Sequence, residues 1–104
     1  MEIRFENKVA FITGAAGGIG YAAARMFAEA GASVVMADLD SRVTDRAKEL
    51  EAEGHNAIGI RCDVSDEVQV KAAVEKAVAV FGKLDIAYNN VGIHAAVRED
   101  LAET

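Results

Sequence analysis

The sequence predicts a three-layer α/β fold, in which a parallel sheet with strand order 3-2-1-4 lies between two layers of helices. Short apolar runs of strand length alternate with longer segments of helical period along the chain. A glycine follows each helical segment of this pattern. The 104 residues contain no proline, repeat or low-complexity segment, so we expect one continuous domain over residues 1–104.

The first strand is predicted at residues 9–12, an apolar run that Gly14 closes. An unbroken apolar run is typical of a parallel strand that is buried on both faces. Residues 18–30 form an alanine-rich segment of helical period, and Gly31 follows it. Because glycine readily adopts the left-handed conformation that ends many helices, we expect the helix to stop there.

A second strand and helix repeat this pattern. Residues 33–37 are the predicted strand, which ends on Asp38. We expect the Ser41 side chain to cap the helix that follows, and Gly54 to end it.

The third unit begins with a predicted strand at residues 57–62. Its helix is expected to open at Ser65, which caps it, with acidic residues from Asp66 onward at the positive end of the helix dipole. Gly82 ends this helix, and residues 84–88 form the last predicted strand. The buried stripe of the helix is predicted to consist of Val70, Val74, Ala77, Val78 and Phe81.

The order of these units predicts how the layers are arranged. Connections between neighbouring parallel strands are right-handed in nearly all proteins. With the strand order 3-2-1-4, the first two helices therefore cover one face of the sheet. The third helix covers the other face, because the chain passes from the third strand to the far side of the first.

Composition and charge exclude several classes of partner. The chain has 17 acidic and 11 basic residues, a net charge of −6, and no basic run that would follow a phosphate backbone, so we expect no nucleic-acid partner. Neither a signal peptide nor an apolar segment of membrane length is present, so we expect a cytoplasmic protein without a membrane partner. The single cysteine, Cys62, is interpreted as a core residue, and no metal site is predicted.

A glycine-rich turn, residues 13–20, connects the first strand to the first helix. A pyrophosphate group needs backbone N–H donors that no side chain obstructs. Gly14 permits a sharp exit from the strand, Gly18 lets the backbone approach the phosphates, and Gly20 allows close packing of the helix. Ile19 lies between the last two, at the positive end of the helix dipole. The turn therefore predicts a Rossmann-type dinucleotide-binding fold.

Asp38 follows the second strand, 24 positions after Gly14. A carboxylate there can accept hydrogen bonds from both hydroxyls of an adenosine ribose, which favours NAD over NADP. A 2′-phosphate would meet this carboxylate, and Arg42 is the only nearby cation, interpreted as a solvated helix residue. The alternative is that Asp38 is simply a turn residue at the end of a strand.

Two further pairs of residues follow the third and fourth strands. Asp63 and Val64 can present a carboxylate to the adenine amino group and an apolar wall to its ring, although such a pair is also common in plain turns between strands and helices. Asn89 and Asn90 begin the segment Asn-Asn-Val-Gly directly after the last strand.

Together these motifs resemble the N-terminal part of a short-chain dehydrogenase/reductase. The glycine pattern T-G-x-x-x-G-x-G, the acidic ribose position, the D-V pair and the N-N-A-G motif are all matched, with Val91 in place of the usual alanine. The resemblance implies that Asn90 and Gly92 neighbour the cofactor and that Asn89 braces the sheet through backbone hydrogen bonds. The complete set of predicted cofactor-binding residues is Gly14, Gly18, Ile19, Gly20, Asp38, Asp63, Val64, Asn90 and Gly92.

The resemblance also implies an activity, the transfer of hydride between a nicotinamide and a carbonyl or alcohol. The family uses a serine and a Tyr-x-x-x-Lys pair, but here Tyr21 is followed four positions later by Arg25, and Tyr88 by Gly92. No catalytic residue is therefore predicted. We expect a truncated sequence, incomplete relative to the full family fold, that holds the cofactor-binding part of an NAD(P)-dependent oxidoreductase.

Two other functions remain open on the sequence. One is a noncatalytic module that binds NAD or docks a complementary fragment. The other is an S-adenosylmethionine methyltransferase, which residues 89–92 disfavour. An incomplete fold would leave the edge of the fourth strand uncovered, so we also expect homo-oligomers or association through this exposed edge.

Overall fold

The computed structural model describes residues 4–90 and confirms the predicted alternation of strands and helices. The elements follow one another in the order β1 (Val9–Thr13), α1 (Gly18–Glu29), β2 (Ser33–Asp38), α2 (Arg42–Ala52), β3 (Ala57–Arg61), α3 (Glu67–Phe81) and β4 (Ile86–Tyr88). No helix within the described residues is both long and apolar enough to cross a membrane.

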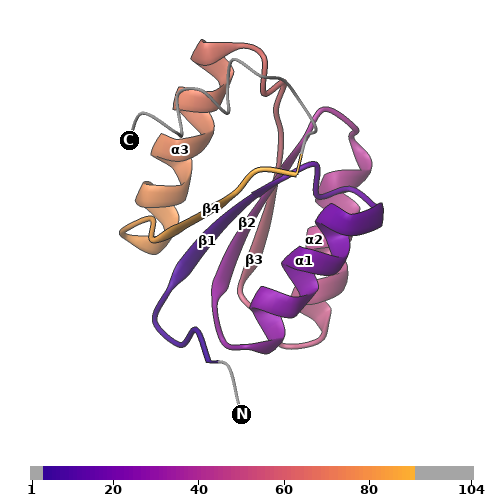
Figure 1. The fold of residues 1–104 in the computed structure, drawn as a ribbon, viewed down its shortest axis with the longest axis vertical. Coiled ribbons are helices and arrows are strands. Elements are labelled where there is room, and N and C mark those ends of the chain that lie inside the picture. The colour runs from indigo at the N-terminus through magenta and orange to yellow at the C-terminus, as the bar shows by residue number, and fades with distance from the viewer. Residues whose placement is uncertain (1–3, 91–104) are drawn as a thin grey trace.

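The strands form one parallel sheet in the predicted order, β3-β2-β1-β4. In the centre of the sheet, Phe11 of β1 pairs with Val35 of β2 on one side and with Ala87 of β4 on the other. Because all strands run in the same direction, their carboxyl ends lie along one edge of the sheet, toward the top of Figure 1. This edge carries the residues that sequence analysis selected.

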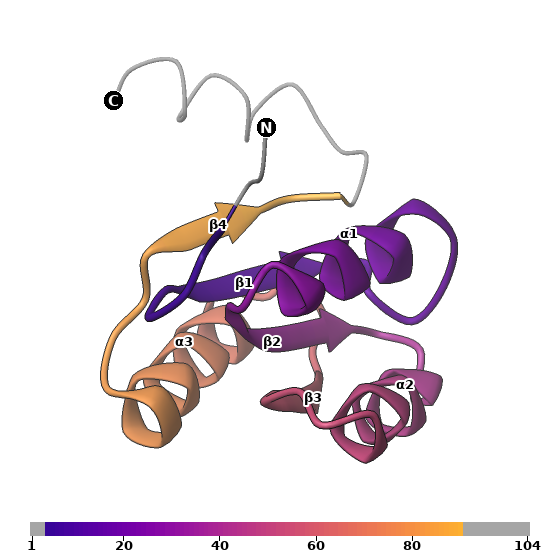
Figure 2. The same cartoon turned by 90° about the horizontal axis from the view of Figure 1, so that it is seen from below.

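Helices cover the two faces of the sheet as predicted, with α1 and α2 on one face and α3 on the other (Figure 2). Alternate residues of the central strands point to opposite faces. Ile12 and Met36 belong to the core under α1 and α2, whereas Phe11 and Val35 belong to the core under α3. The central strands are therefore buried on both faces.

The packing of α3 confirms the predicted stripe at every position but one, because Ala77 is buried and Val70, Val74 and Phe81 pack half-buried against the core on this face. Ala73 and Ala77, one turn apart, are its buried residues. Val78, predicted to lie in the buried stripe, is 43% exposed. The helix meets the sheet through small alanine side chains, and Val78 lies about 100° further around the helix than Ala77. That rotation carries its side chain past the line of contact.

The start of α3 also corrects the prediction, because Asp66 and not Ser65 caps it. The Asp66 backbone is extended (φ −103°, ψ 109°), and its carboxylate accepts hydrogen bonds from the N–H groups of Val68 and Gln69. Ser65 instead donates its hydroxyl to Asp63 Oδ1 at 2.7 Å. An extended backbone is what aims a capping side chain at the first helical N–H groups.

The predicted cap of α2 is wrong for a related reason. Ser41 precedes the helix but has helical dihedrals (φ −61°, ψ −16°), and its side chain makes no capping hydrogen bond. Asp40 takes this role, since its Oδ1 accepts the N–H of Arg42 at 2.9 Å. The predicted glycine ends are confirmed, because Gly31, Gly54 and Gly82 all have positive φ just beyond their helices.

Candidate functional site

The glycine-rich turn between β1 and α1 depends on glycine for two different reasons. Gly14 (φ 63°) and Gly18 (φ 59°) adopt the left-handed conformation, which disfavours residues with a side chain. Gly20 is required by close approach: a Cβ there would overlap the carbonyl oxygen of Gly14 and lie 2.9 Å from Asn90 Nδ2. The helix therefore packs against both the turn and the segment that follows β4.

The N-terminus of α1 presents hydrogen-bond donors to open space. No side chain caps the helix at Gly17. In the described part of the chain, the N–H groups of Gly18, Ile19 and Gly20 have no acceptor, and the first helical bond runs from Tyr21 N to Gly17 O at 3.3 Å. A Cβ on Gly17 or Gly18 would meet nothing within 4 Å. Unpaired N–H groups at the positive end of a helix dipole are suited to an anion such as a phosphate.

Asp38, at the carboxyl end of β2, is tied to the glycine-rich turn. Its Oδ2 accepts the N–H of Ala16 at 2.9 Å, and its Oδ1 accepts the N–H of Asp40 at 2.9 Å. An ionised carboxylate has about four acceptor positions. Each oxygen of Asp38 can thus accept a further hydrogen bond from a ligand hydroxyl while it keeps its backbone partner.

Arg42 is close to Asp38 and is a solvated helix residue as predicted, since its side chain is 64% exposed. Its Nε and Nη2 donate to Asp40 Oδ2 at 2.9 and 2.7 Å. This hydrogen bonding lowers the pKa of Asp40 and raises that of Arg42, so the pair stays ionised at neutral pH. The arginine is therefore occupied by its own neighbour.

Two further arginines lie in the same region, so the prediction of a single nearby cation is wrong. Arg46 Nε donates to the carbonyl oxygen of Ala16 at 3.0 Å, and Arg61 Nε donates to the carbonyl oxygen of Leu39 at 3.0 Å. Arg61 is also the register partner of Asp38 across the sheet. The register of the predicted pairing between β2 and β3 and the rotation of α2 bring these side chains here, and no local pattern in the sequence indicates that register or that rotation.

The Thr13 side chain, which the sequence presents only as the first residue of the glycine pattern, joins the carboxyl ends of β1 and β4. Thr13 Oγ1 donates to Asn89 Oδ1 at 2.9 Å and accepts the N–H of Asn90 at 2.9 Å. The Asn89 side chain thus helps to brace the sheet, and the backbone hydrogen bonds expected of this residue stay a prediction. Asn90 is half-buried beside Gly20, and the predicted residue Gly92 lies outside the described residues.

Asp63 and Val64 follow β3 at the same edge of the sheet. Asp63 Oδ1 accepts both the N–H and the hydroxyl of Ser65, at 2.9 and 2.7 Å, and these bonds lower the pKa of Asp63. Val64 is half-buried and packs against the core under α3.

All predicted site residues within the described range lie at the carboxyl ends of the four strands or in the segments that directly follow them. Residues 4–90 contain no group of three or more His, Cys, Asp or Glu that could hold a metal ion.

Comparison with known proteins gives a consistent family. The sequence model of the short chain dehydrogenases matches residues 8–104. A cis-4-hydroxycyclohexanecarboxylate dehydrogenase from Sinomonas cyclohexanicum is 47% identical over 89 residues, which are 86% of this chain and 36% of that protein. A mitochondrial borneol dehydrogenase from Lavandula x intermedia is 45% identical over 102 residues, or 97% of this chain and 38% of the relative. The chain thus spans little more than a third of the length of these relatives.

Solved structures agree with the sequence comparison. A hydroxysteroid dehydrogenase from Escherichia coli is similar with a TM-score of 0.82 and 40% identity, over 86% of this chain and 39% of that structure. A short chain dehydrogenase/reductase from Burkholderia phymatum, solved in complex with NAD, gives a TM-score of 0.78 and 40% identity, over 82% of this chain and 31% of the other.

Proposed function

Because the chain belongs to the short-chain dehydrogenase family, we propose that it forms the cofactor-binding part of an oxidoreductase that transfers hydride between a nicotinamide and a carbonyl or alcohol. The observation that carries this proposal is the set of unpaired N–H groups at the start of α1. They belong to a turn that borders open space at Gly17 and Gly18 and that is bonded to Asp38 through Ala16. Donors of this kind fit a pyrophosphate, and a carboxylate at the end of the adjacent strand fits a ribose.

Each part of the dinucleotide has a proposed partner along the carboxyl edge of the sheet. The N–H groups of the glycine-rich turn would hold the pyrophosphate, and Asp38 would hold the hydroxyls of the adenosine ribose. The adenine would lie against Asp63 and Val64, and the nicotinamide side would lie near Asn90 and Gly92. The bound cofactor would supply the hydride chemistry. These 104 residues contain no Tyr-x-x-x-Lys, so none of them is assigned an acid or base role.

We expect NAD to bind more tightly than NADP. A 2′-phosphate would lie against the Asp38 carboxylate, which would have to give up a hydrogen-bonded ribose hydroxyl and face a second negative group. The guanidinium groups of the three nearby arginines already have hydrogen-bond partners within the protein. Arg42 is bound to Asp40, while Arg46 and Arg61 donate to backbone carbonyl groups.

Asp38→Asn in the full-length natural protein tests this assignment. Asparagine keeps one oxygen acceptor and loses the charge, and a hydrogen bond to a charged group is worth about 1.5–3 kcal/mol. We therefore expect NADH affinity to fall by roughly tenfold and the preference for NADH over NADPH to shrink. Calorimetric titration of both cofactors measures each effect. Equal affinities of the unmodified protein for NADH and NADPH would refute the preference.

A noncatalytic NAD-binding module is the second candidate, because the glycine-rich turn and Asp38 support binding of a dinucleotide without implying turnover. Such a module would share the proposed cofactor site with the oxidoreductase and would differ from it only in that it does not convert a substrate. An assay of NADH oxidation by the full-length protein, with a panel of carbonyl substrates, separates the two candidates. S-adenosylmethionine, titrated in parallel, is the matched nucleotide control, and its binding in preference to NADH would contradict both.

A further inference from the structure

Helix α2 contacts the glycine-rich turn through the Arg46 side chain. Its Nε donates a hydrogen bond to the Ala16 carbonyl oxygen at 3.0 Å, across 30 positions of sequence. The N–H of the same alanine donates to Asp38 Oδ2 at 2.9 Å. Ala16 is 2% exposed, so a charged side chain holds each polar atom of a buried backbone residue. These two bonds fix Ala16, which directly precedes Gly17 and Gly18 of the turn.

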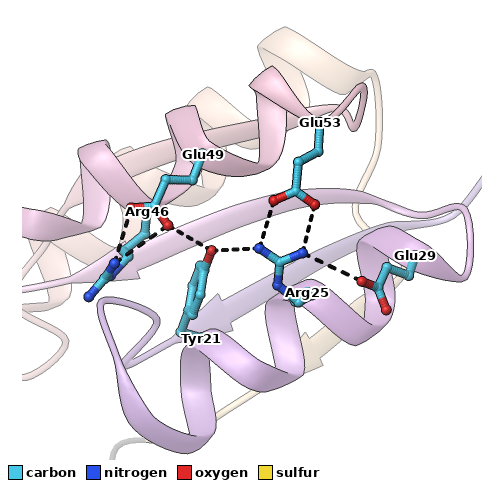
Figure 3. Close-up of polar contacts among 6 residues, drawn as sticks. All are labelled: Tyr21, Arg25, Glu29, Arg46, Glu49 and Glu53. Atoms are coloured by element: carbon cyan, nitrogen blue, oxygen red, sulfur yellow. Dashed lines mark hydrogen bonds and ion pairs between the residues drawn. The ribbon is translucent and has the colours of Figure 1, made fainter.

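Arg46 is itself held by side chains from both helices. Its Nη1 lies 3.1 Å from Glu49 Oε2, and its Cζ lies 5.2 Å from the centroid of the Tyr21 ring. The Tyr21 hydroxyl donates to Glu49 Oε1 at 3.0 Å, which closes a triangle of side chains between α1 and α2 (Figure 3). A guanidinium that is already restricted in this way loses less rotamer entropy when it binds a carbonyl group.

The residues after Ala16 have great conformational freedom of their own. Gly17 is fully extended (φ −175°, ψ −179°), Gly18 is left-handed (φ 59°), and no side chain caps the helix that they open. Glycine loses more freedom on ordering than any other residue. The direction of the unpaired N–H groups therefore depends on how the chain is anchored at Ala16. Donors that are fixed before a ligand arrives cost less affinity to order on binding.

We infer that Arg46 is a positioning residue for the dinucleotide: it holds the glycine-rich turn in the conformation that binds the pyrophosphate, and Tyr21 and Glu49 hold Arg46. This inference rests on the proposed function, because it concerns the same site. Since Arg46 anchors the phosphate-binding backbone, its removal affects ligands with a pyrophosphate more than ligands without one.

The same pair of helices offers a matched comparison. Arg25 lies on the other side of the Tyr21 ring, with its Cζ 5.6 Å from the ring centroid, and bonds Glu53 at 2.7 and 2.8 Å (Figure 3). Within the described residues, no hydrogen bond joins Arg25 or Glu53 directly to the glycine-rich turn. Arg25 reaches the triangle through Tyr21, because its Nη2 donates to the Tyr21 hydroxyl at 3.0 Å. Glu49 lies on α2, and Glu53 directly follows the last residue of this helix. Each binds an arginine, but only the arginine bound by Glu49 donates a hydrogen bond to the turn.

The test uses the full-length natural protein and four variants, Arg46→Met, Arg46→Lys, Glu49→Gln and Glu53→Gln. NADH, ADP and adenosine are titrated calorimetrically into each, and urea unfolding is measured in parallel. We expect Arg46→Met to weaken NADH and ADP binding by about tenfold and adenosine binding distinctly less. Glu49→Gln should weaken the same two ligands by a smaller factor, and Arg46→Lys should lie between wild type and Arg46→Met. Glu53→Gln should leave all three affinities unchanged.

Three results would overturn the inference: equal NADH affinity of wild type and Arg46→Met, an equal loss in Glu53→Gln, or equal losses for ADP and adenosine. If Arg46→Met does not fold, the contrast between Glu49→Gln and Glu53→Gln decides by the same criteria. A wild-type protein that binds neither NADH nor NADPH contradicts the proposed function, and the inference with it. Wild-type binding with an unaffected Arg46→Met contradicts the inference alone.

Discussion

At the scale of single residues, Gly20 is the position where distant segments of the candidate site meet. It lies in the first turn of α1, and a Cβ there would overlap the carbonyl oxygen of Gly14 and approach Asn90 Nδ2 to 2.9 Å. Gly17, the residue before α1, has no such close contact. Its backbone is extended, and a Cβ built on it would meet nothing within 4 Å.

This contrast predicts different effects for two alanine substitutions. Gly20→Ala should lower the free energy of unfolding by about 1–3 kcal/mol, because either the turn or α1 must move to admit the methyl group. It should also weaken NADH binding, since the same movement displaces the N–H donors. Gly17→Ala, the control for stability, should change the free energy of unfolding by less than about 1 kcal/mol. Urea unfolding measures both values, and a Gly20→Ala protein as stable as wild type would contradict the predicted overlap.

The sequence predicts the site residues whose conformation depends on their neighbours in the chain. It misses residues whose hydrogen-bond partners lie far away in the sequence. The conformation of the glycine-rich turn follows from its own residues, and Asp38 is placed by the strand that precedes it. Thr13 and Arg46 find their partners 76 and 30 positions away. The sequence indicates Arg42 as the only cation near Asp38, yet Arg46, one turn later on the same helix, contacts the glycine-rich turn. Which of the two does so depends on the rotation of α2 against the sheet, which no local pattern determines.

At the scale of elements, the sequence predicts where helices end better than where they begin. A glycine with positive φ follows each helix, because few other residues adopt that conformation. Several polar residues can cap the start of a helix, and their backbone dihedral angles determine which of them does so. Asp66 caps α3 because its backbone is extended, while Ser41 fails to cap α2 because its backbone is already helical. The short polar segments before α2 and α3 do not reveal these dihedrals in advance.

The pairing of β4 with β1 begins at Asp85. Its N–H donates to the Val9 carbonyl oxygen at 2.9 Å, and its Oδ2 accepts the Val9 N–H at 2.8 Å. Lys83 Nζ lies 3.3 Å from the same oxygen. The hydrogen bond from Val9, and then the interaction with Lys83, lower the pKa of Asp85. Both polar groups of Val9 thus bond Asp85, and the Val9 N–H bonds its ionised carboxylate.

The lowered pKa of Asp85 predicts a dependence of stability on pH. A carboxyl group whose pKa is lower in the folded than in the unfolded state stabilises the fold above its unfolded pKa of about 4, and this contribution disappears as the pH falls through the folded-state value. Asp85→Asn should therefore reduce the free energy of unfolding at pH 7 and flatten its decline in acid. Urea unfolding over a series of pH values measures this slope. Glu75→Gln, which changes an exposed carboxylate of α3, is the control, and equal slopes for wild type and Asp85→Asn would contradict the assignment.

At the scale of the whole molecule, the two faces of the sheet are covered unequally. Within residues 4–90, α1 and α2 lie on one face and α3 alone lies on the other (Figure 2). The exposed apolar residues of α3 are Val68 at 76%, Val78 at 43% and Val80 at 50%. A second apolar surface, a hollow of about 350 Å³ at the C-terminal end of α1, is lined by Phe5, Met26, Phe27, Glu29 and Ala30. Surfaces of this kind promote contact between molecules.

A polypeptide of residues 1–104 alone should therefore associate. Among the described strands β4 pairs only with β1, and exposed valines lie on α3, so the edge of β4 and these side chains are the expected places of contact with a second copy. We expect sedimentation velocity to show an average mass that rises with protein concentration. Replacing Val68 and Val80 by lysine should lower that mass, because both side chains are exposed and neither contributes to the core. A monomer at every concentration would contradict the prediction. An unchanged association of the double variant would assign it to the edge of β4 instead of to α3.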